Sequence, residues 1–238
     1  MTESLWLSTA VGMSAFLGVG IVLVWRNLSK RLIACSLSLS ATVMLSVALF
    51  DLLPAAVSAQ GGFVHLGLGM GAALITMLGL HRMLDSQQEV ENPYNRLGGY
   101  LAAAIVVHNI PEGAVIGVGY GAEPELGFTL AIAMAIHNIP EGVGLAAPLL
   151  AGGRSPITIL GISLIAGGAL PFGTWLGEIF LTDSPDSVAA GLFFAATTMI
   201  WVVVKEVMPR SWQIEPKASA WGFGLGCMLS WVIHLFHH

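Results

Sequence analysis

The hexapeptide HNIPEG occupies residues 108–113 and recurs, letter for letter, at residues 137–142. Each copy lies within a run of apolar residues long enough to cross a bilayer. A histidine, an asparagine, a glutamate and a helix-breaking proline therefore occur twice in segments where ionisable groups are costly and indicate function. We interpret the rest of the chain as the setting for this pair.

The composition is that of a polytopic membrane protein. Of the 238 residues, 55% are hydrophobic and 10% are charged, and the mean hydropathy is +0.81, whereas about 25% of the residues in a soluble domain are charged. The nine Lys and Arg residues are scattered and form no basic patch, so we expect no nucleic-acid partner. Cys35 and Cys227 lie in apolar runs without C-x-x-C spacing, which indicates buried thiols outside any disulfide or thiolate zinc site.

Eight stretches contain the roughly 20 apolar residues that a helix needs to cross a hydrocarbon core. They predict an all-α polytopic membrane protein of one domain, residues 1–238, with eight transmembrane helices at residues 5–25, 33–57, 62–81, 98–119, 127–150, 156–180, 187–207 and 218–236. The links between them are short, so we expect no soluble domain. The first stretch lacks a basic n-region and a clear cleavage site, and we expect it to be retained as a helix.

The positive charges predict the orientation in the membrane. With eight helices, all nine Lys and Arg residues fall on one side, and cytoplasmic loops carry the excess of these residues. We therefore expect both termini on the non-cytoplasmic side of a cell membrane (inner or plasma membrane). The opposite loops carry Glu123, Glu125, Asp183 and Asp186, and an acidic outer face raises the local concentration of cations.

A second, weaker repeat flanks the hexapeptides. An acid stands three residues before a proline at 51–54 (DLLP) and at 206–209 (EVMP), late in the predicted helices 33–57 and 187–207. The first of these helices runs outward and the second inward, so Asp51 and Glu206 would lie at opposite faces, as an inverted repeat requires. This predicts an inverted 3+2+3 arrangement with the hexapeptide helices central, and makes Asp51 and Glu206 candidate pathway residues. The alternative for each is an acid at a helix end that meets water or, for Glu206, Lys205.

The hexapeptides form a candidate metal site. Residues four apart share one face of a helix, so His108 pairs with Glu112, and His137 with Glu141. The short link between the two predicted helices makes them antiparallel neighbours. At about 1.5 Å per residue, His108 lies ~17 Å and His137 ~15 Å from that link, near mid-membrane. A single charged side chain there costs ~3 kcal/mol, so a divalent cation or bound protons must offset these charges.

The types of ligand restrict the metal. Imidazole and carboxylate without thiolate suit Zn²⁺, Fe²⁺, Mn²⁺, Co²⁺ or Cd²⁺. Asn109 and Asn138, next to the histidines, offer neutral oxygens to a second ion bridged by the two glutamates. Pro111 and Pro140 lack the N–H that would bond the carbonyl four residues earlier, so we expect a kink and a freed carbonyl in each helix. The alternative is that His and Glu only hydrogen-bond between the helices.

These motifs resemble those of the ZIP family of divalent-metal transporters, specifically its bacterial zinc-uptake-like branch. The resemblance covers the whole chain: both HNIPEG copies, the eight spans, LLPAA after Asp51 and KEVMP around Glu206. It implies a primary metal site of His108, Glu112, His137 and Glu141, and a secondary site formed by Asn109 and Asn138 with the same two glutamates. It also implies metal as substrate without a prosthetic group, transport toward the cytoplasm by elevator-like alternating access, and a homodimer in the lipid bilayer.

Two positions depart from the family's pattern. Many relatives have a glutamate before the proline of the sixth span, whereas this chain has Leu170, so we expect the secondary site to be weak or empty. The link after the third span, His-rich in many members, has only His81 at its edge, which argues against metal sensing there. Weaker candidates for collecting metal at the outer face are His65, His234, His237 and His238. The alternative for each of these is a solvated interfacial histidine.

The leading interpretation is a transporter of a divalent transition metal, with Zn²⁺ the first candidate. The rival is an intramembrane zinc-dependent hydrolase, in which the same side chains would activate water. That chemistry needs a separate general base, as in H-E-x-x-H, which is missing, and a near-twofold duplication suits a pathway better than an asymmetric active site. A binding-only sensor is disfavoured because the chain has no soluble output domain. We therefore expect no enzymatic activity.

Overall fold

The computed structural model describes residues 2–25, 29–59, 62–85, 92–122, 124–180 and 185–237. Within these ranges it leaves out some side chains, among them those of His137, His234 and His237, and His238 lies outside the ranges. The described part of the chain is helical apart from short turns and contains no strand. Its elements are α1 (Thr2–Val24), α2 (Lys30–Val47), η1 (Ala48–Leu52), α3 (Leu53–Ser58), α4 (Phe63–Asp85), α5 (Pro93–Ala122), α6 (Pro124–Ala151), α7 (Pro156–Phe180), α8 (Pro185–Val202), η2 (Val203–Val207), α9 (Met208–Ile214) and α10 (Pro216–His237).

These elements form eight rods in the described chain, because α2, η1 and α3 run on as one rod, and α8, η2 and α9 as another. Each rod overlaps one of the predicted spans. Six of the described rods are long and apolar enough to cross a membrane, and α6 and α10, with 28 and 22 residues, are of comparable length. The chain is therefore an all-α polytopic membrane protein, as predicted.

Prolines and polar caps determine where several helices begin. α5, α7 and α10 each start at a proline, whose missing N–H needs no partner in the first turn. The side chain just before each proline caps the helix. Asn92 Oδ1, Ser155 Oγ and Glu215 Oε2 accept hydrogen bonds from backbone N–H groups of the first turn at 2.9, 3.2 and 2.6 Å.

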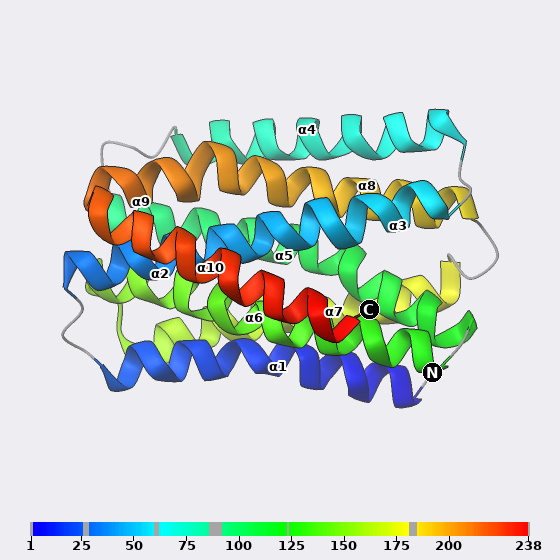
Figure 1. Cartoon of the computed structure of the whole chain (residues 1–238), viewed down its shortest axis with the longest axis horizontal. Coiled ribbons are helices and arrows are strands. Elements are labelled where there is room, and N and C mark those ends of the chain that lie inside the picture. The colour runs from blue at the N-terminus through cyan, green and yellow to red at the C-terminus, as the bar shows by residue number, and fades with distance from the viewer. Residues whose placement is uncertain are drawn as a thin grey trace.

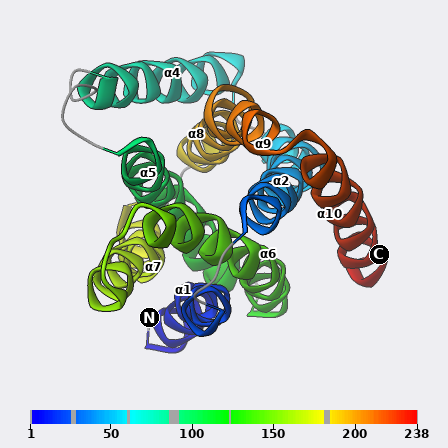
Figure 2. The ribbon, with the colours of Figure 1, turned by 90° about the vertical axis from the view of Figure 1, so that its left-hand side faces the viewer.

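The rods form two groups, which Figure 2 shows nearly end-on. In the first group α1 packs against α6 and α5 against α7, and α5 and α6 meet in the middle. In the second group α10 packs against α2 and α4 against α8; the groups meet where α5 contacts α8 and α2 contacts α6. Each of these contacts has a counterpart in the other half of the chain, which is the predicted inverted 3+2+3 plan. Figure 1 shows the rods side by side, with the start of α1 and the end of α10 toward the same end.

Closely packed glycines show the repeat residue by residue. Gly18 of α1 lies against the carbonyl of Ile139 in α6, and Gly173 of α7 lies against the carbonyl of Ile110 in α5. Ile110 and Ile139 are equivalent positions of the two hexapeptides, and the two glycines stand 155 positions apart, at 18 and 173. A Cβ on either glycine would overlap the carbonyl oxygen. The two hexapeptide helices are therefore held by equivalent partners, α1 and α7.

Each half of the chain also contains a π-helical turn with an acid. Asp51 lies in η1 and Glu206 in η2, again 155 positions apart, and the N–H after each turn bonds the carbonyl five residues earlier. The sequence predicted a helix end at residue 207, before Pro209, but the rod continues as α9. The prediction was wrong because the widened turn places Pro209 at the start of a new helical segment, where its missing N–H is not needed.

Candidate metal centre

The two hexapeptides bring ionisable side chains of α5 and α6 into contact. His108 Nε2 of α5 lies 2.8 Å from Glu141 Oε1 of α6. His108 and Glu112 have no exposed surface, and Glu141 is 3% exposed. Groups buried to this degree at membrane depth require a partner of opposite charge, a hydrogen bond or a bound cation. The contact therefore joins the two copies of the repeat in one polar site.

The other two predicted ligands belong to the same helices. Glu112 follows His108 by four residues on α5. His137 precedes Glu141 by four residues in the backbone of α6, but its side chain lies outside the described residues. Among the side chains that the structure describes, no three of His, Cys, Asp and Glu are close enough together to hold a metal ion. A site with all four ligands is thus a proposal that rests on the His108–Glu141 contact and on the repeat.

The two asparagines hold neighbouring helices and leave their oxygens unused. Asn109 Nδ2 donates to the carbonyl of Ala166 in α7 at 3.0 Å, and Asn138 Nδ2 donates to the carbonyl of Val11 in α1 at 3.1 Å. Val11 and Ala166 are again 155 positions apart. Both Oδ1 atoms are buried and have no hydrogen-bond partner among the described residues. Buried acceptors normally have a partner, so these oxygens are available to a donor or a cation.

The prolines of the hexapeptides do not interrupt their helices. Pro111 lies inside α5 and Pro140 inside α6, and each helix continues beyond its proline. Because proline has no N–H, the carbonyl four residues earlier loses its usual helical partner. The predicted kinks and the use of these carbonyls at the site stay predictions.

On the α7 side, the side chain one turn beyond the Asn109 contact is apolar. Leu170, one turn beyond Ala166, is fully buried and packs in a small cluster with Val11, Ile116, Ala131 and Met134. Its side chain fills space next to the asparagine contacts without offering a ligand. This packing supports the expectation of a weak secondary site.

Glu206, a predicted pathway residue, pairs with a histidine that the sequence analysis assigned no role. Its Oε1 lies 2.9 Å from His81 Nδ1 of α4, and the two side chains are 9% and 40% exposed. Lys205, the alternative partner, instead lies with Nζ 5.9 Å from the centre of the Trp201 ring. Asp51 occupies the equivalent π-turn and is half-buried. Both acids thus belong to the second group of rods, which packs against the helices that carry the hexapeptides.

An aromatic contact links the His81–Glu206 pair to α5. Trp201 Nε1 of α8 donates to the hydroxyl of Tyr100 at 3.2 Å, and the Tyr100 ring meets the His81 ring edge-on with centroids 6.3 Å apart. Tyr100 stands eight residues before His108 on the same helix and is 3% exposed. The sequence analysis missed Tyr100. Its hydroxyl group inside the apolar span 98–119 was the feature of the sequence that could have indicated a polar contact there.

Glu178 is an acid that the sequence analysis missed. It lies within α7 and accepts a hydrogen bond from Ser4 Oγ of α1. Glu3, the residue before Ser4, accepts a hydrogen bond at Oε2 from the hydroxyl of Tyr120 at the end of α5, at 2.6 Å. These contacts join α1 to α7 and to α5 toward the end of the bundle where the chain starts. An acid within the predicted span 156–180 was a signal of function that deserved weight.

The structure changes the interpretation of two residues, His65 and Cys227. His65 Nδ1 lies 3.1 Å from Asp186 Oδ1, with both side chains more than two-fifths exposed, so it has a surface partner and is not merely solvated. Cys35 and Cys227 are free thiols, as expected, but Cys227 is exposed on α10 and not buried. The side chains of His234, His237 and His238, which were further candidates for collecting metal, lie outside the described residues.

Comparison with known proteins shows the family of this chain. The model of the ZIP zinc transporter family matches residues 85–233. Zinc transporters named ZupT from Shigella dysenteriae and from Escherichia coli O7:K1 are each 34% identical over 249 residues, which covers 97% of this chain and 94% of the relative. A ZupT from Salmonella arizonae is 33% identical with the same coverage. The chain therefore belongs to the ZIP family of zinc transporters.

Proposed function

We propose that this chain carries Zn²⁺ toward the cytoplasm through a mid-membrane site that opens alternately to the two sides. The proposed ligands are His108, Glu112, His137 and Glu141. Family membership makes the chain a transporter of divalent metal ions and not an enzyme, which removes the hydrolase interpretation. Fe²⁺, Mn²⁺, Co²⁺ and Cd²⁺ suit the same ligands and are further candidate substrates.

The contact between His108 and Glu141 is the observation that carries the proposal. Imidazole nitrogen and carboxylate oxygen are both zinc ligands, and here they meet between two helices at 2.8 Å in a buried setting. The two side chains can satisfy each other by this hydrogen bond. A divalent cation can replace this hydrogen bond with two metal–ligand bonds, and its loss restores the hydrogen bond. Such an exchange suits a site that must both bind and release its ion.

We also propose that Asn109 and Asn138 form the secondary site together with Glu112 and Glu141, and that this site is weak. The unused Oδ1 atoms of both asparagines support a cation at this level. Leu170 offers no ligand there. A site with two neutral amide oxygens and two shared carboxylates holds a second divalent ion less tightly than one with a further carboxylate.

The proposal also covers the path of the ion, the orientation of the chain in the membrane and its oligomeric state. We propose that Asp51 receives ions on the outer side and that Glu206 releases them inside, because their equivalent π-turns both come late in rods that run in opposite directions. The one-sided distribution of Lys and Arg supports both termini on the non-cytoplasmic side. We also propose that two copies of this chain form a homodimer in the membrane, because the family resemblance implies one.

Zinc uptake into proteoliposomes tests the proposal. Uptake of radioactive zinc by the wild type should be lost in His108→Ala, His137→Ala and Glu141→Gln. Glu215→Gln is the matched control, because Glu215 caps α10 outside the site and glutamine can still accept that hydrogen bond. Wild-type uptake by Glu141→Gln, or equal loss in Glu215→Gln, would contradict the proposed site.

A further inference from the structure

A pocket of about 280 Å³ lies where the starts of α2 and α5 meet α9. Its polar lining comes from all three elements and consists of Lys30 of α2, Tyr94 of α5, and Arg210 and Gln213 of α9. The rest of the lining is apolar, and no acid is among the described residues that form it. We call this hollow the α2–α5–α9 pocket.

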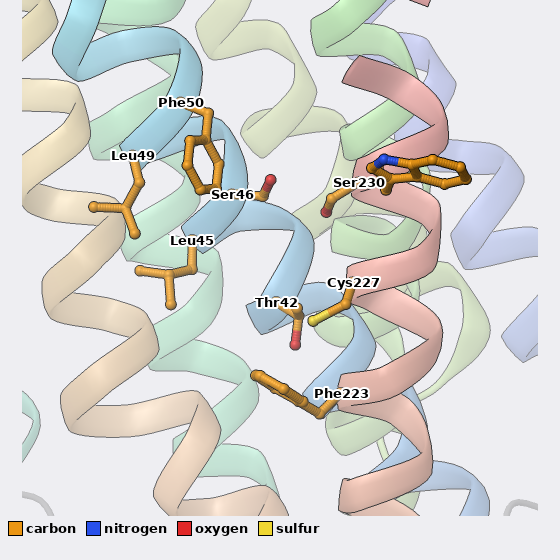
Figure 3. A pocket seen from close by; sticks show the side chains of 9 residues that line it. Thr42, Leu45, Ser46, Leu49, Phe50, Phe223, Cys227 and Ser230 are labelled. Carbon is orange, nitrogen blue, oxygen red and sulfur yellow. The ribbon is translucent and has the colours of Figure 1, made fainter. Parts of the chain in front are cut away.

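The charge of this pocket distinguishes it from the hollow between the α2–η1 segment and α10. None of the side chains that line that second hollow is charged, and Thr42, Ser46 and Ser230 supply only hydroxyl groups to it (Figure 3). An uncharged lining of this kind does not identify a ligand. The α2–α5–α9 pocket, by contrast, brings two cations together.

The two cations have no counter-charge within the described part of the chain. Neither Lys30 Nζ nor the Arg210 guanidinium forms an ion pair or a hydrogen bond with a described residue. The acids nearest to Arg210 in sequence have other partners. Glu206 Oε1 lies 2.9 Å from His81 Nδ1, and Glu215 Oε2 accepts from a backbone N–H of α10 at 2.6 Å. Both positive charges are therefore available to an anion.

Two helix ends add to this positive charge. α2 begins at Lys30 and α5 at Pro93, and neither helix has an acid in its first turn. The N-terminal end of a helix carries roughly half a positive charge, so a lysine there is unfavourable without an anion nearby. An anion in the pocket would lie close to both cations and to both helix ends, and would offset this repulsion.

The pocket lies at the level of the lipid headgroups. The rod of α2, η1 and α3 spans 29 residues, Lys30–Ser58. At 1.5 Å per residue this is ~43 Å, which matches the roughly 40–45 Å of a bilayer with its headgroups. The start of α2 lies at the same end of the bundle as α9, on the left in Figure 1. Lipid phosphates occur at this level, and soluble phosphate reaches it from the water.

We propose that the α2–α5–α9 pocket binds a phosphate group, either as inorganic phosphate or in the headgroup of a phospholipid. The Arg210 guanidinium can bind two phosphate oxygens at once, and the Lys30 ammonium binds as a point charge. The Tyr94 hydroxyl and the Gln213 amide can donate to the remaining oxygens. The bound group joins α5 of the first group of rods to α2 and α9 of the second. No proposed zinc ligand lines the pocket, so this binding does not depend on the zinc site.

Two binding assays on the purified, metal-free protein in mild detergent test the proposal and distinguish the sources. One measures radioactive inorganic phosphate at equilibrium in excess chloride, and the other measures phosphatidic acid retained after delipidation. The wild type should hold one phosphate group per chain in at least one assay. Binding of inorganic phosphate identifies soluble phosphate as a ligand, whereas retention of phosphatidic acid alone identifies a lipid headgroup. A wild type that holds neither would overturn the proposal.

Substitutions of the cations locate the binding. Lys30→Gln/Arg210→Gln should lower it at least tenfold, because charged hydrogen bonds to phosphate are lost. Arg31→Gln/Lys217→Gln is the matched control, because it removes the same charge from a neighbouring hollow between α2 and α10, and it should bind as the wild type does. Lys30→Gln alone changes an exposed side chain, leaves folding intact and should still weaken binding. Equal loss in the control, or full binding without both cations of the pocket, would contradict the proposed site.

Acids of the chain itself are the alternative occupant. Glu89 and Glu91 precede Pro93 and lie outside the described residues. Equal phosphate binding by the wild type and by Glu89→Gln/Glu91→Gln would support the proposal. Binding that appears only in this variant would assign the pocket to these acids and overturn it.

Discussion

His108 Nε2 and Glu141 Oε1 lie 2.8 Å apart between α5 and α6, and each belongs to a different copy of the same hexapeptide. The two copies of the repeat thus meet in one buried polar contact. Because each side chain is the buried partner of the other, a change at either one should affect the stability of the protein as well as the proposed metal binding. The two effects can be separated by choosing the substitution.

Glu141→Gln should weaken zinc binding by at least 100-fold with little loss of stability. Glutamine keeps an oxygen that can accept from His108, whereas the metal loses an anionic ligand, and loss of even a supporting partner costs 10- to 100-fold in affinity. Zinc at 100 times the wild-type Kd raises wild-type stability by about 2.7 kcal/mol. At the same concentration the variant should gain about 0.4 kcal/mol or less. Thermal unfolding with and without zinc measures both values.

Glu141→Ala should lower the stability of the ion-free protein further, by about 1 kcal/mol, the scale of an interhelical hydrogen bond in a membrane. Glu215→Ala removes a cap outside the site and should leave the zinc-dependent shift in Tm unchanged. A full zinc-dependent shift in both Glu141 variants would show that this carboxylate is not a ligand.

Leu170→Glu should create a second occupied metal site. Leu170 packs beside the asparagine contacts of α7, and a carboxylate there would add charge to two available amide oxygens. We expect the wild type to bind about one Zn²⁺ per chain and the variant about two, measured by equilibrium dialysis with metal analysis. Leu170→Gln has nearly the same shape without charge and should remain at one. Two tightly bound ions in the wild type would contradict the prediction.

Gly18→Ala should destabilise the protein by ~1–3 kcal/mol, the usual cost of forcing an atom into a packed interface. Its Cβ would overlap the carbonyl oxygen of Ile139 in the second hexapeptide, and the α1–α6 contact would have to open. Gly20→Ala is the control in the same helix, because a Cβ there meets nothing within 4 Å and alanine favours a helix. The Tm in detergent should fall for Gly18→Ala only. Equal values for the two variants would show that this approach is not tight.

Much of the fold follows from the sequence because bilayer physics leaves few alternatives. Length and hydropathy locate the eight rods, and HNIPEG with its 29-residue spacing identifies α5 and α6 as the central pair. The shift of 155 positions between equivalent residues of the two halves could be predicted from the acids at 51 and 206. The glycine contacts that follow the same shift could not be predicted. Glycines are common throughout the chain, and their packing partners depend on helix rotation.

Side-chain partners that come from different helices could not be read from the sequence. His81 is separated from Glu206 by more than a hundred residues, and a π-turn changes the direction in which Glu206 points. Periodicity of 3.6 residues does not anticipate such a turn. The same holds for Ser4 with Glu178, because their contact depends on the α1–α7 packing.

Glu206→Gln should slow zinc uptake about tenfold while the affinity of the central site changes less than twofold. Glu206 lies on η2, in the second group of rods. A charge held at membrane depth there attracts a cation that leaves the central site toward the cytoplasm. His81→Gln should have a smaller effect of the same kind, because it removes the partner 2.9 Å from Glu206 but leaves the carboxylate. Lys205→Gln is the control, since its ammonium lies over Trp201. Rates from proteoliposomes and affinities from zinc titration separate the two quantities, and a parallel loss of both in Glu206→Gln would place this acid in the central site instead.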